Sequence, residues 1–372
     1  MGYGKGETIR VGIIGCGGIA NGKHMPSIAK LKNIGIEMVA FCDIVEQRAI
    51  DAAKKFGTPD AKVYTDYKEL LADPTIDDVH VCTPNRSHSF ITVDALEAGK
   101  NVMCEKPMAM NYEEAKKMLD AKNRTGKSLT IGYQNRQTPE HRYLRDQVEK
   151  GRFGDIYYAK ATAIRRRAVP TWGVFMNEYE QGGGPLIDIC THSLDGTLWV
   201  IDNYKPKVCF GKTFHKLSQL PSELQGNSWG GWDPEQFTVE DSAFGMCLME
   251  DGTLIRLETS WALNTTHNVP EGRTAIFGTL AGADCVDSDL RINGVRDGRP
   301  FVETITCKPS RGAAYFDGVG DEDIKIREQR VWYNYLRGEG ELFVKPEQAY
   351  VVSQILEGIY ESDRTGKEVV FD

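Results

Sequence analysis

The chain has 372 residues, which is enough for roughly two domains of ordinary size. Hydrophobic residues make up 41% of the sequence, so packed cores can form and global disorder is not expected. The net charge of −8 argues against a nucleic-acid partner, which usually requires a basic face. Residues 1–10 lack the apolar core of a secretory signal, and no apolar run approaches the roughly 20 residues of a membrane span. We therefore expect a cytoplasmic protein that does not contact a membrane.

The nine cysteines are scattered along the chain and include no Cys-x-x-Cys pair. An odd number without such a pair favours neither disulfides nor a zinc site. Several stand in apolar, strand-like runs, as Cys82 and Cys104 do. We therefore expect buried, reduced thiols and no bound metal.

The first third of the chain alternates strand and helix patterns. Apolar runs predict strands at residues 8–15, 38–43, 78–83, 101–104 and 128–133. Helical patterns lie between them, for example at 87–98 and 112–122. Asn111 is the expected N-cap of the second of these helices, with Glu114 as its capping-box partner. Strands that alternate with helices indicate a parallel sheet with helices on both faces.

After about residue 133 the pattern changes. Helices are predicted at 138–150, 184–201 and 347–365, and strands at 155–165, 242–249, 253–261, 275–278 and 290–293. The Asp251-Gly252 step between two alternating runs is typical of a hairpin turn. We therefore expect residues 134–372 to form an α+β domain on a large, mostly antiparallel open sheet. One face would carry helices, and the other would be free for a ligand or a neighbouring subunit.

A glycine-rich turn follows the first predicted strand directly. Gly15 permits the tight turn, Gly17 lets the backbone approach a pyrophosphate, and Ala20 lets helix and strand pack closely. The N-terminus of the next helix would face the phosphates with unpaired N–H groups. The second strand ends in Asp43, whose carboxylate can accept hydrogen bonds from both ribose hydroxyls. Residues 1–133 are therefore predicted to be a dinucleotide-binding Rossmann domain.

Asp43 also indicates which dinucleotide binds. Its carboxylate would repel a 2′-phosphate, so we expect NAD rather than NADP. Arg48 follows closely and would soften this preference if it reached the same place. A solvated position on the next helix is the simpler interpretation of Arg48.

Two further segments carry candidate catalytic residues. Lys106 stands just past the end of a predicted strand, where ligands of open α/β sheets bind, although an exposed surface lysine is the ordinary alternative. Three glycines and Pro185 precede a helical segment in which Asp188 and His192 are four residues apart. Their side chains are expected to meet, and a carboxylate beside an imidazole orients a general base for an alcohol proton. The alternative is a helix ion pair without chemistry.

Taken together, these segments resemble the glucose–fructose oxidoreductase and inositol dehydrogenase (Gfo/Idh/MocA) family over nearly the whole chain. The resemblance rests on the Gly15 turn, the run Thr83-Pro84-Asn85-Arg86-Ser87-His88, Glu105-Lys106-Pro107, the glycines with Asp188 and His192, and the tail 359–367. One departure is Cys190, which stands where many relatives have glycine between the Asp and the His.

The resemblance implies roles for individual residues. Lys106 would hydrogen-bond the reacting hydroxyl and assist proton transfer, His192 would be the general base, and Asp188 would orient it. Pro107 would follow a cis peptide bond. The residues assigned to the cofactor are Gly15, Gly17, Gly18, Ile19, Asp43, Thr83, Pro84, Asn85, His88, Glu105, Lys106 and Gln134.

The expected substrate residues lie in the second domain, apart from Lys106. Arg and amide side chains hydrogen-bond hydroxyls, and Trp stacks on sugar faces. These residues are Lys106, Asn135, Arg165, Trp172, Asp188 and His192. Arg136, Arg166 and Arg167 are neighbouring candidates, although surface solubility is the ordinary role of arginine. The stretch 212–238, with Trp229 and Trp232, is interpreted as a long irregular insertion. A substrate lid and a subunit contact are equally favoured interpretations of its role.

The sequence therefore predicts an NAD-dependent dehydrogenase that oxidises a ring secondary hydroxyl of a sugar or glycoside to a ketone. The 3-position is one candidate, as in the glycoside 3-dehydrogenases of the family. An inositol-type cyclitol is the nearest rival substrate. We also consider an enzyme that uses NAD transiently to cleave glycosidic bonds without net redox change, and a catalytically silent NAD sensor. The resemblance further implies a homo-oligomer, either a dimer or a tetramer.

Overall fold

The computed structural model describes residues 3–4, 6–266, 269–286, 289–307 and 323–371. The chain divides into two compact units. Unit 1 comprises Met1–Gln134 and Glu322–Tyr350, and unit 2 comprises Asn135–Asp321 and Val351–Asp372. No helix in the described part of the chain is long and apolar enough to cross a membrane.

Unit 1 contains a six-stranded parallel sheet. Its strands, in spatial order, are β3 (Lys62–Tyr64), β2 (Ile36–Cys42), β1 (Ile9–Ile14), β4 (Asp78–Val81), β5 (Asn101–Cys104) and β6 (Leu129–Ile131). The order reverses between β1 and β4, which is the place where doubly wound sheets bind their ligands. The five predicted strands are confirmed. Strand β3 is not predicted from the sequence, because its three residues are too few to show an alternating pattern.

Helices cover both faces of this sheet. On one face α1 (Met25–Ala29) and α2 (Glu46–Phe56) pack on β2, and α4 (Asn85–Glu97) packs beside α5 (Tyr112–Thr125) near β5 on the other. Asn111 caps α5, since its side chain accepts a hydrogen bond from the Glu114 N–H at 2.9 Å. The predicted doubly wound architecture is thereby confirmed.

A helix from late in the sequence completes unit 1. Helix α9 (Ile324–Leu336) packs against α1, and its Trp332 and Tyr333 contribute to the same core. The winding order β1–α1–β2–α2–β3 places its helices over one half of the sheet, and α9 reaches β4 in the other half. The predicted boundary at residue 133 places residues 322–350 in the second domain, whereas the structure packs them with unit 1.

Unit 2 is built on a nine-stranded sheet, in which β7 and β10 form the parallel pair and the remaining described pairs are antiparallel. Its strands, in spatial order, are β14 (Arg299–Thr306), β13 (Asp289–Arg296), β12 (Ala281–Val286), β11 (Val269–Gly278), β7 (Ile156–Ile164), β10 (Leu254–Ser260), β9 (Ser242–Met249), β8 (Pro206–Phe214) and β15 (Val369–Val370). The Asp251-Gly252 step joins β9 to β10, with Gly252 at φ +91°. The prediction of a large, mostly antiparallel sheet is confirmed.

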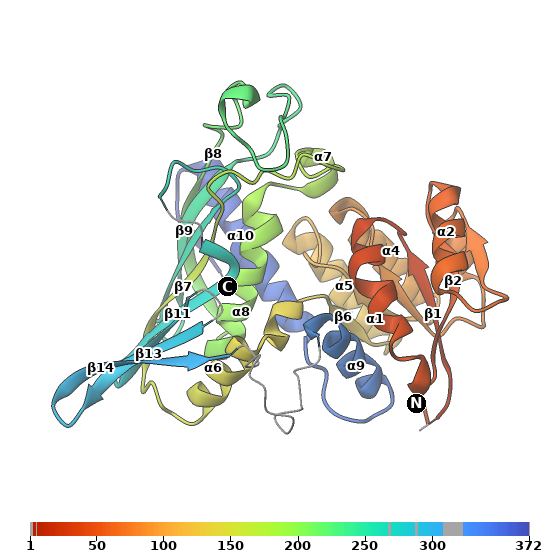
Figure 1. The fold of residues 1–372 in the computed structure, drawn as a ribbon, viewed down its shortest axis with the longest axis horizontal. Coiled ribbons are helices and arrows are strands. Elements are labelled where there is room, and N and C mark those ends of the chain that lie inside the picture. Colours follow the sequence, from red (N-terminus) through yellow and green to blue (C-terminus); the bar gives the residue numbers. More distant parts are fainter. Residues whose placement is uncertain (1–2, 5, 267–268, 287–288, 308–322, 372) are drawn as a thin grey trace, which may run out of the picture. The chain divides into compact units, whose positions relative to one another are not determined.

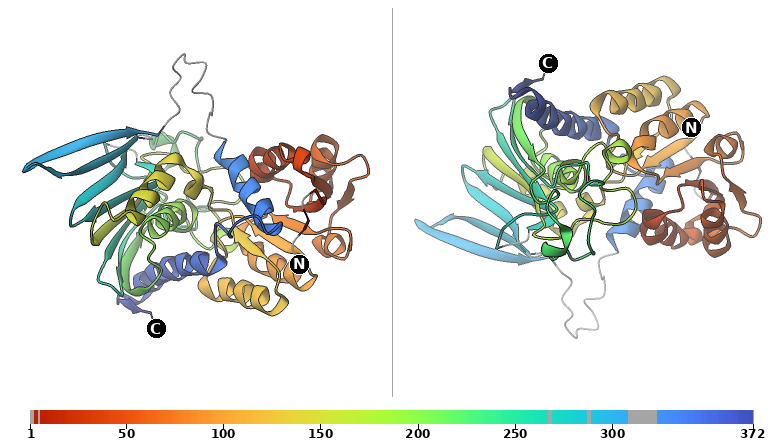
Figure 2. Two further views of the ribbon diagram at one scale, coloured as in Figure 1. Left: turned by 90° about the horizontal axis from the view of Figure 1, so that it is seen from below. Right: turned by 90° about the horizontal axis from the view of Figure 1, so that it is seen from above.

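One face of this sheet is covered by helices, as Figures 1 and 2 show. Helix α8 (Thr191–Ile201) packs on β7 and β11, and α6 (Pro139–Glu149) packs on α8. Helix α10 (Pro346–Thr365) approaches the sheet where Gly211 of β8 pairs with Gly245 of β9. A Cβ at these glycines would come within 2.7 and 2.5 Å of Ile359, so the absence of side chains makes room for the helix.

The opposite face of the sheet has no covering helix in the described part of unit 2 (Figure 2). Phe210 of β8 and Met246 of β9 are partners across the two strands. They remain 50% and 49% exposed. This agrees with the expectation of one covered and one open face.

Candidate active site

The glycine turn lies where the strand order of unit 1 reverses. Gly15 has φ +90°, and a Cβ there would approach the Cys82 carbonyl oxygen to 2.7 Å, so only glycine fits. A Cβ at Gly17 or Gly18 would meet nothing within 4 Å, which leaves open space beside the backbone. Ala20 is fully buried under the turn. This combination of a tight turn and an open backbone fits a dinucleotide pyrophosphate.

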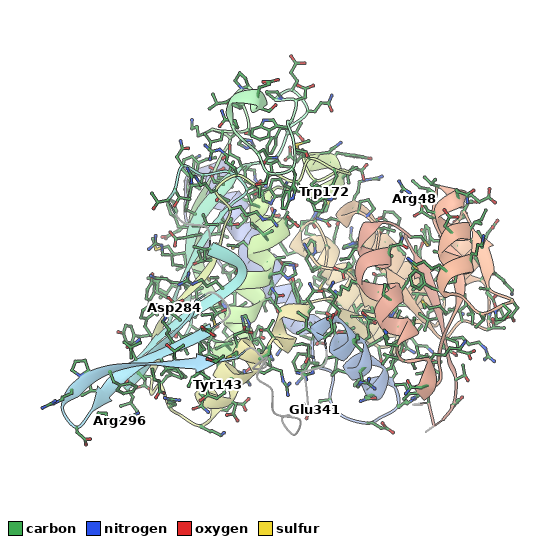
Figure 3. The ribbon with its side chains drawn as sticks, in the orientation of Figure 1. Arg48, Tyr143, Trp172, Asp284, Arg296 and Glu341 are labelled. Atoms are coloured by element: carbon green, nitrogen blue, oxygen red, sulfur yellow. The ribbon has the colours of Figure 1, made fainter. Side chains whose placement is uncertain are left out.

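Asp43 is held over the same turn. Its Oδ2 accepts the Cys16 N–H at 2.9 Å, and its Oδ1 accepts the Val45 N–H at 2.9 Å. A guanidinium nitrogen of Arg48, labelled in Figure 3, lies 3.9 Å from Oδ1, and the Arg48 side chain is 58% exposed. The carboxylate is therefore fixed in place, while Arg48 is a loosely bound neighbour within reach of it.

The segment 83–88 borders this turn. A Cβ at Gly15 would also come within 3.0 Å of the Thr83 side chain, which shows how closely the two loops approach. The Ser87 hydroxyl donates to Thr83 Oγ1 at 2.7 Å, and Asn85 begins α4 directly after Pro84 with its side chain buried. The structure thus brings these predicted cofactor residues to the same edge of the sheet.

His88 joins this segment to the loop that carries Lys106. Its ring nitrogens lie 2.8 Å from the Pro107 carbonyl oxygen and 2.9 Å from the Thr83 carbonyl oxygen. The ring is buried, and this burial lowers the pKa of the imidazole. Because both nitrogens lie against backbone carbonyls, His88 positions the two loops rather than offering a polar atom to a cofactor. The Lys106–Pro107 peptide bond is cis, which confirms that expectation.

Glu105 lies in a buried group of charged side chains. Its Oε1 is 2.7 Å from the Lys23 ammonium and 2.7 Å from His24 Nε2, and its Oε2 accepts the Lys106 N–H at 3.1 Å. Burial opposes ionisation of Glu105, but Lys23 and His24 outweigh this effect and hold the pKa of the carboxyl well below its usual range. Gly132 makes room for the pair, since a Cβ there would approach Glu105 Oε1 to 3.0 Å. Glu105 thus fixes the backbone at the proposed catalytic lysine.

This network continues to α9. The Lys23 ammonium lies 2.9 Å from Glu328, whose pKa is raised to about 7 by burial. His24 Nδ1 lies 2.7 Å from His80 Nδ1, and His80 Nε2 lies 2.9 Å from the Tyr333 hydroxyl. None of these residues is predicted from the sequence. The available signal was His80, an imidazole between the two valines of β4.

In unit 2, Asp188 and His192 stand at the junction of two kinds of helix. Asp188 lies in a π-helical turn, Leu186–Cys190, and His192 lies in the first turn of α8. The side chains are 9% and 6% exposed, and the Trp261 indole N–H donates to Asp188 Oδ2 at 3.2 Å. The pair therefore stands on a continuous helical segment, with the carboxylate oriented by a buried indole.

Two of the three glycines before this segment have a packing role. Their sequence alone indicates a relaxed chain, but a Cβ at Gly183 would overlap the Tyr360 hydroxyl, and one at Gly184 would overlap the Glu240 carbonyl. The Glu240 carboxylate accepts the Gly184 N–H at 2.8 Å, the Leu186 N–H at 3.0 Å and the Tyr360 hydroxyl at 2.9 Å. These contacts fix the start of the helical segment that carries Asp188.

The arginine candidates differ in their burial and in their hydrogen-bond partners. The prediction that Arg136 faces the substrate is wrong, because it is fully buried and its Nε donates to Asp195 at 2.9 Å. Arg167 donates to the carbonyls of Gln225 and Leu263 at 3.0 and 2.9 Å, and Arg166 is exposed. The guanidinium of Arg165 is partly buried, donates to the Ala168 carbonyl at 3.2 Å and is attracted electrostatically by Asp188.

The aromatic candidates gather near Arg165. Its guanidinium lies 5.2 Å from the centre of the Trp229 ring, and the Trp172 and Trp229 ring centres are 4.8 Å apart. Trp232 is instead 5% exposed, and its indole N–H donates to the Ser218 carbonyl at 2.8 Å. The irregular stretch begins later than predicted, because β8 continues to Phe214.

Two of the remaining candidates, Gln134 and Asn135, lie where the two units join in sequence. Gln134 begins the 3₁₀ turn Gln134–Gln137. Asn135 lies against Gly272 of β11, whose φ of +78° and missing side chain leave room for the amide. Ile19 is 42% exposed beside the glycine turn.

Comparisons with known proteins agree with this geometry. Residues 9–133 match the model of the GFO/IDH/MocA oxidoreductase family with its NAD-binding Rossmann fold, and residues 141–283 match a GFO/IDH/MocA C-terminal domain. The chain belongs to this family and is an NAD-binding oxidoreductase.

Individual relatives point in the same direction. The chain is 34% identical over 363 residues to a D-glucoside 3-dehydrogenase of Escherichia coli K12, covering 98% of this chain and 97% of that protein. It is 30% identical over 238 residues to an inositol 2-dehydrogenase of Salmonella typhimurium, covering 63% of this chain and 65% of the relative. A solved levoglucosan dehydrogenase in complex with NADH and levoglucosan shares the fold, with a TM-score of 0.82, 21% identity and coverage of 98% and 99%.

Glu240 makes the stability of unit 2 depend on pH. Burial raises the pKa of its carboxyl from 4.5 to about 7, although the N–H donors of Leu186 and Gly184 act in the opposite direction. Since the folded pKa exceeds the unfolded one, this contribution is fully present below the unfolded pKa and is lost as the pH rises through about 7. We expect urea unfolding midpoints of the wild type to fall more steeply between about pH 5 and about pH 8 than those of Glu240→Gln.

Glu235→Gln is the matched control, because Glu235 is exposed in the same region of the chain. It should reproduce the wild-type dependence. Parallel profiles for the wild type and Glu240→Gln would contradict this assignment.

Proposed function

We propose that this enzyme oxidises a ring secondary hydroxyl of a sugar or glycoside to a ketone, with the 3-position as the first candidate. The observation that carries the proposal is the helical segment that bears the buried Asp188 and His192. Glu240 anchors the start of this segment, and Trp261 donates to Asp188. The similarity to a D-glucoside 3-dehydrogenase extends over nearly the whole chain and supports the substrate class.

The residues divide the chemistry as follows. Bound NAD supplies the acceptor for the hydride that leaves the carbinol carbon. His192 removes the proton of the hydroxyl, and Asp188 keeps the imidazole in the orientation and charge state that this transfer requires. The Lys106 ammonium stabilises the negative charge that develops on the oxygen. The proton thus passes to the imidazole while the C–H bond gives up its electron pair.

Removing either proton-handling group should slow the reaction. We expect Lys106→Ala and His192→Ala each to reduce the single-turnover rate of NADH formation by ~10²-fold or more, the usual range for a positioned acid–base group. Lys117→Ala removes an exposed lysine of α5 and is the control, which should keep the wild-type rate. Rates near wild type in both active-site variants would refute these roles.

The cofactor preference depends on Asp43. Its fixed carboxylate accepts ribose hydroxyls and repels a 2′-phosphate, so the wild type should bind NAD more tightly than NADP. Asp43→Asn should bring the ratio of the dissociation constants of NADP and NAD closer to one, as measured by fluorescence titration. Because Arg48 lies 3.9 Å from the carboxylate, Arg48→Ala should weaken NADP binding more than NAD binding. Tighter binding of NADP than of NAD by the wild type would overturn this proposal.

A cyclitol substrate is the second candidate, because inositol 2-dehydrogenases are among the relatives. A screen of monosaccharides, inositols and glycosides, followed at the absorbance band of NADH, separates the two. Steady accumulation of NADH with one class identifies it as the substrate class. Release of an aglycone without NADH would indicate glycosidic bond cleavage with no net redox change.

We also propose that the protein forms a homo-oligomer, either a dimer or a tetramer, through the open face of the nine-stranded sheet. The half-exposed Phe210 and Met246 lie side by side there, and exposed apolar patches of this kind mark subunit contacts. Phe210→Lys with Met246→Glu should lower the sedimentation coefficient to that of a smaller species. Phe90→Lys, a change at an exposed aromatic residue of α4, should leave it unchanged. A monomeric wild type would contradict the proposal.

The redox state of the cysteines indicates the cellular compartment of the protein. All nine lie within the described residues and are free thiols, and seven of them are buried. Buried unpaired thiols fit a reducing compartment, and we therefore assign the protein to the cytoplasm.

A further inference from the structure

An aromatic cluster lies at the end of unit 2 that carries the catalytic pair. Trp172 packs edge-on against Trp229, with ring centres 4.8 Å apart, and against Phe175 at 5.9 Å. Figure 3 labels Trp172, and its neighbour Trp229 belongs to the loop 215–241. The two indoles remain 51% and 43% exposed, which is unusual for such large apolar side chains.

The loop that carries Trp229 is firmly held. Asn227 accepts the Val169 N–H at 2.8 Å and donates to the Val169 carbonyl at 3.1 Å. The next residue, Ser228, donates its N–H to the Arg167 carbonyl at 3.2 Å, and the Thr171 hydroxyl donates to the Trp229 carbonyl. The exposed indole is therefore presented by fixed backbone, and little conformational entropy would be lost when a ligand covers it.

A series of neighbouring groups leads from these indoles to Asp188. The Arg165 guanidinium lies 5.2 Å from the centre of the Trp229 ring and is attracted by the Asp188 carboxylate. The Arg165 backbone pairs with Ser260, and the following residue, Trp261, donates to Asp188. All of these groups belong to unit 2, so the arrangement is independent of unit 1.

We propose that Trp172 and Trp229 form a subsite for the aglycone of a glycoside, with Arg165 binding hydroxyls between the aglycone and the oxidised ring. The preferred substrates would be glycosides whose aglycone is itself a ring, either a second pyranose or an aryl group, because flat rings stack on indoles. This inference rests on the proposed oxidation of sugars and specifies the substrate class of that site. It also assigns the loop around Trp229 to substrate binding rather than to a subunit contact.

The test compares methyl, phenyl and glucosyl glucosides as substrates. The wild type should show a kcat/KM about three- to tenfold higher for the two ring-bearing aglycones than for the methyl glucoside, as expected for one stacked ring. This ratio should fall toward one in Trp229→Ala and Trp172→Ala, and Trp229→Phe should retain part of it. Tyr157→Ala is the matched control and should keep the wild-type ratio. Tyr157 is an exposed aromatic residue near the start of β7, whereas Arg165 follows the other end of this strand.

Binding is measured separately from turnover by quenching of intrinsic tryptophan fluorescence. Tighter binding of phenyl glucoside than of methyl glucoside, lost in Trp229→Ala, would support the subsite even if no glucoside were oxidised, and only the proposed reaction would then fall. Equal kcat/KM values for all three glucosides, unaffected by both tryptophan variants, would overturn the subsite while leaving sugar oxidation in place. A lower sedimentation coefficient of Trp229→Ala would also overturn it, because the indole would then belong to a subunit contact.

Discussion

The position of the proposed catalytic lysine depends on a buried ion pair. Lys23 and Glu105 are almost fully removed from water and 2.7 Å apart, so each buried charge depends on the other for stabilisation. The same carboxylate accepts the backbone N–H of Lys106. Any displacement of this loop would separate two charges in an apolar interior, which is far more costly than a change in an exposed loop. The cost of separating these buried charges thus keeps the backbone of Lys106 in a fixed position, from which its flexible side chain extends.

Unit 2 also holds a functional segment in place with a buried carboxylate, but with different residues. The helical segment with Asp188 and His192 begins at three glycines, which would ordinarily be a mobile sequence. Here the glycines allow Tyr360 and the Glu240 backbone to approach more closely than any side chain would permit. The Glu240 carboxylate then accepts hydrogen bonds from the buried N–H groups at the start of the helical segment. Both units therefore anchor a functional segment to a buried carboxylate that contacts its backbone.

Much of this was predictable from local sequence. The Rossmann strands, the glycine turn, Asp43 and the helical segment with Asp188 and His192 are signals contained within short segments, and the structure contains each of these elements. What escaped prediction is determined by contacts between distant parts of the chain. Arg136 resembled a substrate residue until Asp195, fifty-nine residues away, proved to be its partner. The place of α9 in unit 1 depends on Asp78 and His80 meeting residues more than two hundred and fifty positions later. No local pattern encodes such pairings.

The contribution of α9 to unit 1 has a consequence for synthesis on the ribosome. When residue 134 has been translated, all six parallel strands exist, but the helix that covers β4 is not yet present. Asp78 and His80 then lack Trp332 and Tyr333, and Lys23 lacks Glu328. The N-terminal unit therefore cannot reach its final core until nearly the whole polypeptide has emerged. Unit 1 comes first in the sequence, but its core is completed only after most of unit 2 has been translated. The order of translation therefore couples the folding of the two units.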